Sequence, residues 1–160
     1  MRRAGCRWLT RVWVLLPLLV PAVTPAHAAP DVSGIWLGHD RDGHVEIRPC
    51  GQFLCGYIIS IIDPSLPPNP RDIYNEKVEQ RSRPICGLQV LGNLKNEGDS
   101  WSDGWVYDPR RGKTFDVDVW LKGPDTLAVR GYMGIRVLSE TKIWTRAGKN
   151  VPRCARASHN

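Results

Sequence analysis

Turn-forming residues recur at hairpin spacing along most of this chain, and they separate short runs in which apolar and polar side chains alternate. Alternation with a period of two is typical of strands that bury one face. The Asp42-Gly43 pair predicts a two-residue turn between strands at 34–39 and 45–49, which would set Trp36 opposite Pro49. The whole pattern predicts about eight antiparallel strands, and that number favours one closed up-and-down barrel over a sandwich.

The second half of the chain predicts a definite strand register. Short turns set Val106 opposite Phe115 and Asp118 opposite Arg130, and a last strand is expected at 136–146. This register gathers aliphatic side chains on one face and an ion pair on the other, which supports it over its one-residue slips. The face that carries Val106, Phe115, Val117, Val119 and Leu121 is the expected interior. In a barrel of this size the interior either is filled by side chains or holds one small ligand.

The stretch from 63 to about 100 interrupts the alternation. It contains five prolines and has no sustained period of two. We therefore expect a long connection over the barrel surface, partly helical at 75–83 and ending before Pro84. A connection of this length can carry function or simply cover the barrel. The predicted fold class is thus all-β, one antiparallel barrel with a long, partly helical connection.

The first 28 residues have the pattern of an export signal. Basic residues precede an apolar run at 12–23, and Ala26-His27-Ala28 is a small-x-small cleavage site. The run of about 12 residues is shorter than the roughly 20 that a membrane-spanning helix needs. We expect cleavage after residue 28, a barrel domain at 29–146 and a polar tail at 147–160. The protein is expected to be periplasmic or secreted, with no stable membrane anchor after cleavage.

Charge argues against a nucleic-acid partner. The chain has 22 Lys and Arg and 16 Asp and Glu, and four of the arginines lie in the first 28 residues, so the mature balance is 18 − 16 = +2. The remaining basic residues are dispersed among acidic ones, and nucleic-acid binders need a continuous basic surface.

Four cysteines follow the export signal. In an oxidising compartment an even number predicts two disulfides, and three pairings are possible. Their spacing does not match the usual zinc ligand patterns, so we predict no metal and no cofactor. In the register of the first hairpins Cys50 lies opposite Cys55, which makes that bond geometrically possible. The candidates are Cys50, Cys55, Cys86 and Cys154.

A set of short motifs extends over nearly all of the mature chain. They are Gly34-Ile35-Trp36, Val45-Glu46-Ile47-Arg48-Pro49-Cys50-Gly51, Leu54-Cys55-Gly56, Arg81-Ser82-Arg83-Pro84-Ile85-Cys86-Gly87-Leu88, Gly104-Trp105-Val106-Tyr107-Asp108-Pro109, Gly112-Lys113-Thr114-Phe115 and Gly131-Tyr132-Met133-Gly134. Together they resemble the bacterial domain-of-unknown-function 2147 family (DUF2147). The resemblance implies an exported protein, a barrel like those of lipocalins and fatty-acid-binding proteins, and no assigned activity. Cys154 lies outside the family pattern.

A second, looser resemblance concerns the closed end of lipocalin-like barrels. These barrels carry Gly-x-Trp on the first strand and a basic residue on the last strand that covers the tryptophan. Trp36 and Arg146 are similar in position. The resemblance implies a structural role for both, with a cation over the indole ring worth about 0.5 to 2 kcal/mol.

These features favour a protein that binds a small apolar or amphipathic molecule inside the barrel. Arg81 and Arg83 lie on the long connection, where guanidinium groups could meet an anionic head group or instead pair with strand acids. The full set of candidate ligand-binding residues is Arg81, Arg83, Trp105, Tyr107 and Tyr132.

Two other classes of function stay open. A cell-envelope structural or interaction module would have a filled barrel and an exposed aromatic patch. A carbohydrate-active enzyme would use strand carboxylates, with Asp103, Asp116 and Asp118 as candidates. His39 and His44 flank a turn and are expected at a solvated hairpin tip. No nucleophile paired with a base is visible, so we assign no catalytic residue, and the sequence identifies no protein partner.

Overall fold

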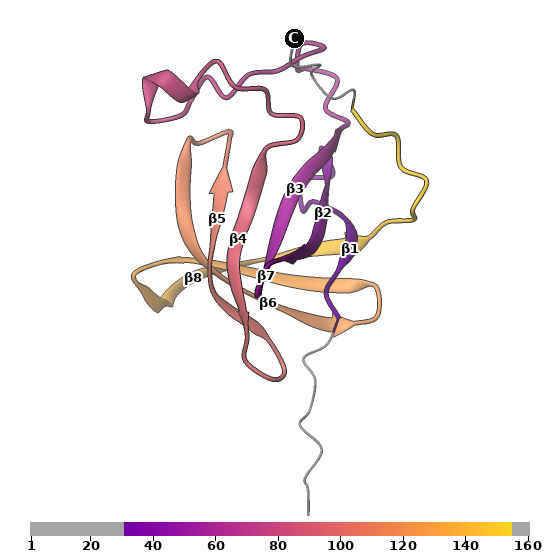
Figure 1. Cartoon of the computed structure of the whole chain (residues 1–160), viewed down its shortest axis with the longest axis vertical. Coiled ribbons are helices and arrows are strands. Elements are labelled where there is room, and N and C mark those ends of the chain that lie inside the picture. Colours follow the sequence, from indigo (N-terminus) through magenta and orange to yellow (C-terminus); the bar gives the residue numbers. More distant parts are fainter. Residues whose placement is uncertain (1–30, 155–160) are drawn as a thin grey trace, which may run out of the picture.

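The computed structural model describes residues 31–154, and within them eight antiparallel strands close into one barrel (Figure 1). Each strand pairs with the next, and the last pairs back with the first, so the predicted up-and-down barrel is confirmed. The predicted export signal at 1–28 lies outside the described residues, as do residues 155–160. No helix within 31–154 is long and apolar enough to span a membrane. The strands are β1 Gly34–Leu37, β2 Gly43–Cys50, β3 Phe53–Ile61, β4 Gln89–Asn96, β5 Trp101–Asp108, β6 Lys113–Gly123, β7 Thr126–Met133 and β8 Ile135–Arg146.

The predicted register holds in the second half of the barrel and fails in the first hairpin. Val106 pairs with Phe115, and Asp118 pairs with Arg130, as expected. Trp36, however, pairs with Val45, not with Pro49. The β1–β2 turn is longer than two residues because Gly38 N–H donates to the carbonyl of Gly43 and Arg41 takes a left-handed φ of 59°.

The long connection ends earlier than the sequence predicts. It runs from 62 to 88, and its regular structure is a single 3₁₀ turn, η1 Val78–Gln80, inside the expected helical stretch. Residues 89–96 form strand β4. The strand lacks a clean period of two because its pairing with β3 is shifted twice and Asn93 has a positive φ of 57°. Bulges of this kind put consecutive side chains on one face and hide the alternation.

The C-terminal segment at 147–154 lies along the outside of the barrel. Ala147 N–H donates to the carbonyl of Ile35, and Arg153 makes two bonds to the carboxylate of Glu46, at 2.6 and 3.1 Å. Cys154 then forms a disulfide with Cys86 of the long connection. In Figure 1 the C-terminal segment and the connection meet at the upper end of the barrel. The first part of the predicted polar tail is therefore fastened to the barrel, and we call residues 147–154 the strap.

The second disulfide joins Cys50 to Cys55 across the β2–β3 turn. The two residues are not directly opposite, because Cys55 pairs with Arg48 and Cys50 pairs with Phe53. Their Cα atoms are 5.8 Å apart, within the range that a disulfide spans. Both disulfides that the even cysteine number predicts are thus present.

Candidate ligand-binding cavity

One half of the barrel is filled, and the other half is hollow. Trp36 is fully buried near the chain's entry into β1, and aliphatic side chains such as Leu127 and Val119 pack around it. Toward the opposite end a cavity of about 1150 Å³ opens to solvent, somewhat above the size of most small-molecule sites. Its inner wall is apolar and includes Val45, Ile58, Val90, Val106, Phe115, Val129 and Trp144.

The closed end is sealed by an arginine. The guanidinium carbon of Arg146 lies 4.1 Å from the centre of the Trp36 ring. Arg146 also donates to the carbonyls of Pro124 (2.8 Å) and Ser33 (3.0 Å), and the indole N–H of Trp36 donates to the carbonyl of Val32 (2.9 Å). The structure therefore brings together the two residues expected at this end, and they link the chain's entry to the β6–β7 turn.

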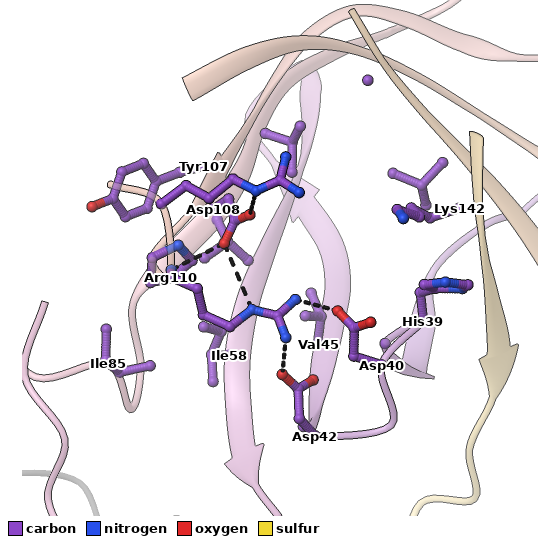
Figure 2. A pocket seen from close by; sticks show the side chains of 18 of the residues that line it. His39, Asp40, Asp42, Val45, Ile58, Ile85, Tyr107, Asp108, Arg110 and Lys142 are labelled. Atoms are coloured by element: carbon purple, nitrogen blue, oxygen red, sulfur yellow. Dashed lines mark hydrogen bonds and ion pairs between the residues drawn. The ribbon is translucent and has the colours of Figure 1, made fainter. Parts of the chain in front are cut away.

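Charged residues from two turns meet at the open end. Arg110, in the β5–β6 turn, pairs with Asp40 and with Asp42 (2.9 Å), both in the β1–β2 turn, and lies 3.9 Å from Asp108 (Figure 2). The hydrogen bond to Asp40 is the main reason that the pKa of Arg110 is raised. Arg110 thus bridges two turns that are about 70 residues apart in sequence.

Apolar side chains surround the same opening. Two segments supply them, the long connection and the β7–β8 turn region, and each side chain is exposed. We call this group the crown: Leu66, Ile73, Tyr74, Met133, Val137 and Leu138.

A buried polar network fastens the long connection to the barrel. Asp72 is fully buried and accepts a hydrogen bond from the Tyr107 hydroxyl (2.6 Å), while Arg83 pairs with it at 2.8 Å. Asn75 donates to both Asp72 and Tyr107. Burial is the largest cause of the raised pKa of Tyr107, followed by its bond to Asp72. Arg81 donates to the carbonyl of Asn75, at the edge of this network.

The structure divides the candidate ligand-binding residues into two groups. Tyr107 and Tyr132 border the cavity, whereas Arg81, Arg83 and Trp105 are absent from its lining. Both arginines are engaged by the network around Asp72. The ring of Trp105 covers Gly92, where a Cβ would come within 2.5 Å of the indole.

The three candidate carboxylates do not line the cavity. Asp118 is almost fully buried and contacts Arg130 (2.6 Å) and Arg136 (2.9 Å). Burial raises the pKa of Asp118, but the hydrogen bonds from both arginines outweigh it, and the net pKa is lowered. Asp103 pairs with Arg136 and Lys95, and Asp116 accepts the Gly134 N–H. A carboxylate held ionised by two arginines is a poor general acid.

Sequence reasoning missed the residues that organise the opening. Arg110 was not singled out, because the turn contacts that engage it join segments far apart in sequence. His44 lines the cavity, although it was expected at a solvated hairpin tip. Its Nδ1 is enclosed without a hydrogen-bond partner among residues 31–154, and burial lowers its pKa. The longer β1–β2 turn, which places His44 within β2, leaves no local sequence signal.

Comparisons with known proteins agree with this description. The model of a family described as "Uncharacterized protein conserved in bacteria (DUF2147)" matches residues 34–146. A solved structure, titled as protein HP1028 from Helicobacter pylori and as belonging to the lipocalin family, is similar with a TM-score of 0.67 and 24% sequence identity. The alignment covers 74% of this chain and 84% of that one, and it supports the lipocalin-like fold. No curated protein matches the sequence.

Proposed function

The chain belongs to the DUF2147 family of uncharacterized bacterial proteins. From its cavity, we propose that this protein is an exported carrier that binds one small apolar or amphipathic molecule inside the barrel. The observation that carries this proposal is the hollow half of the barrel, which has an apolar wall and opens to solvent. A filled barrel would have no room for a ligand, whereas here a cavity of about 1150 Å³ stays open between the barrel wall and the long connection. The sealed end at Trp36 and Arg146 leaves the other end as the entrance.

The disulfides support export. Two disulfides in a domain of this size are typical of oxidising compartments. We therefore propose that residues 1–28 are an export signal, that 29–146 form the barrel domain, and that the protein works in the periplasm or outside the cell. Residues 147–154 then belong functionally to the barrel, because the strap packs on it.

The two alternatives are less well supported. For a carbohydrate-active enzyme, Asp103, Asp116 and Asp118 would have to face a cleft, and here they lie outside the cavity lining, with cations or a backbone N–H beside them. For an envelope interaction module, the exposed crown is favourable, but the hollow interior would have no role. A carrier uses both features.

Native mass spectrometry of the mature protein, purified from a periplasm, tests the carrier proposal. We expect a discrete extra mass that denaturing extraction releases. Val106→Trp places a large ring in the cavity wall and should abolish that mass, whereas Thr114→Trp, at an exposed position on the neighbouring strand, should keep it. A bare wild-type mass that stays bare after incubation with N-phenyl-1-naphthylamine, a neutral apolar probe, would contradict the proposal.

A further inference from the structure

We propose that the crown docks on the surface of a lipid bilayer, so that the cavity exchanges its ligand directly with the membrane. The inference rests on the proposed carrier function and names the place where the carrier loads or unloads. The crown is the ring of Leu66, Ile73, Tyr74, Met133, Val137 and Leu138 around the opening.

Exposed apolar side chains are concentrated at the open end. Among residues 31–154, all the large hydrophobic side chains that are exposed belong to two stretches, 62–78 and 133–143. Crown members are 42% (Leu66) to 83% (Val137) exposed. Single exposed hydrophobic residues are ordinary, but a contiguous group marks a surface that meets another apolar phase.

The crown is continuous with the cavity. Each of its six side chains also lines the cavity, so apolar groups border the path from the interior to the outside along the connection and the β7–β8 region, while the Arg110 ion pairs lie on the remaining side. A ligand that prefers this interior to water would cross water on leaving, unless the crown is pressed against a phase that dissolves the ligand. The acyl region of a bilayer is such a phase, whereas a protein partner would also have to provide a matching cavity.

The connection side of the crown is held in place. Asp72 precedes Ile73 and is anchored to Tyr107 and Arg83. The carbonyl of Tyr74 approaches Gly112 so closely that a Cβ there would overlap it, and Gly112 has a positive φ of 67°. Ile73 and Tyr74 are therefore presented by a fixed backbone, which lowers the entropic cost of inserting them.

Charge indicates how the crown would bind. The connection around it carries Arg71, Lys77 and Arg81, but Glu76 and Glu79 stand among them. Beside the opening, Lys142 is paired with Glu140, and Arg110 is paired with Asp40 and Asp42. Positive and negative charges around the crown are nearly balanced, so they do not favour anionic lipids. Insertion of the apolar crown side chains into the bilayer should supply the binding free energy. Binding to zwitterionic vesicles should therefore be insensitive to salt.

Vesicle flotation of the full mature protein tests the proposal, with vesicles of phosphatidylcholine alone at 0.1 and 1 M salt. We expect the wild type to float at both salt concentrations. Val137→Ser/Leu138→Ser removes two apolar groups from the crown and should lower the partition coefficient at least about tenfold. Ile143→Ser makes the same kind of change on β8 at a residue outside the cavity lining and should leave flotation unchanged.

The outcomes separate this inference from the carrier proposal. The fluorescence of N-phenyl-1-naphthylamine, measured without vesicles, reports the cavity in the wild type and in both variants. If the probe binds but no protein floats, or if the crown variant floats like the wild type, the docking inference is wrong and the carrier stands. Concentration-dependent dimerisation that the crown variant abolishes, without flotation of the wild type, would assign the crown to a protein contact instead. If the probe fails to bind any of them, the carrier proposal fails as well.

Discussion

At one end of the barrel Arg146 lies over the buried ring of Trp36, whereas at the other end Arg110 lies among carboxylates. Arg146 is 28% exposed and donates at 2.8 and 3.0 Å to two backbone carbonyls, which keep their positions as long as the barrel is folded, and its contact with the Asp125 carboxylate is longer, at 3.7 Å. Arg110 is 58% exposed, and its partners are carboxylates on a turn. The same residue type therefore seals one end permanently and bridges the other end through contacts that can open without unfolding.

The closed end should give the largest loss of stability. Trp36→Ala removes a fully buried ring together with its contact with Arg146, and it should cost about 3 to 5 kcal/mol of unfolding free energy. Val106→Ala, in the wall of the cavity, should cost much less, because that side chain already borders open space. Urea denaturation of both variants makes the comparison. Equal losses would mean that the two halves are packed alike, contrary to the structure.

The two ends of the barrel also differ in the disulfide that each contains. Cys86 and Cys154 are 68 residues apart in sequence and join the connection near the opening to the strap, whereas Cys50 and Cys55 are 5 residues apart at the closed end. In the chain-entropy account the longer loop gives more stability, so we expect a loss of about 2 to 4 kcal/mol for Cys86→Ala/Cys154→Ala. Cys50→Ala/Cys55→Ala should lose less. Denaturant midpoints of the two double variants test the order, and a reversed order would contradict it.

The polar network around Asp72 should contribute less to the unfolding free energy than Trp36 or the Cys86–Cys154 disulfide. Arg83→Met leaves the Asp72 carboxylate buried with only Tyr107 and Asn75 as partners, and we expect a loss of about 2 kcal/mol because Arg83 is itself partly exposed. Arg81→Met is the matched control, since among residues 31–154 the side chain of Arg81 donates only to the carbonyl of Asn75. Thermal unfolding should rank the two variants in this order. Equal melting temperatures of the two variants would contradict an anchoring role for the contact between Arg83 and Asp72.

Protonation of His44 should weaken the folded state on the cavity side. Burial lowers the pKa of His44 below its ordinary 6.5, so the unfolded chain binds more protons than the folded chain as the pH falls through 6.5. The stability that depends on neutral His44 is complete above pH 6.5 and is lost as the pH falls. Unfolding takes up at most one proton through this group, which limits how steeply the unfolding free energy falls with pH. We expect His44→Gln to lose less stability than the wild type between pH 7.5 and 5.5, as followed by melting temperature. Parallel curves would show that His44 has the same pKa in the folded and the unfolded chain, contrary to the effect of its burial.

How much of the fold could be predicted depended on local signals. The β6–β7 register follows from aliphatic residues on one face and the Asp118–Arg130 pair on the other, and it was predicted correctly. Strand β4 was missed because its bulges and the left-handed Asn93 break the alternation. The first hairpin was misregistered because Asp42-Gly43 has the chemistry of a short turn, while hydrogen bonding favours a longer one.

The cavity was predictable in its apolar wall but not at its opening. Val106 and Phe115 were assigned to the interior from the alternation alone, and both line the cavity. Arg83 was placed on the right segment, but its contact with Asp72 needs the connection to fold back on β5. Arg110 and the crown depend on which turns meet in space, and no periodicity reports that.

The bridge at the opening should have the smallest effect on stability and a visible effect on exchange. Arg110→Ala removes exposed ion pairs, which should cost less than about 1 kcal/mol. Because the bridge spans the entrance, the same change should speed the release of N-phenyl-1-naphthylamine severalfold in stopped-flow experiments. Arg111→Ala is the control, since its ion pair with Asp108 stays within one turn. Salt at 1 M should speed release from the wild type and leave Arg110→Ala unaffected, since screening weakens the same contacts. Unchanged release in Arg110→Ala would mean that the ligand passes elsewhere, for instance between β1 and β8, which pair through only two residues each within the described chain.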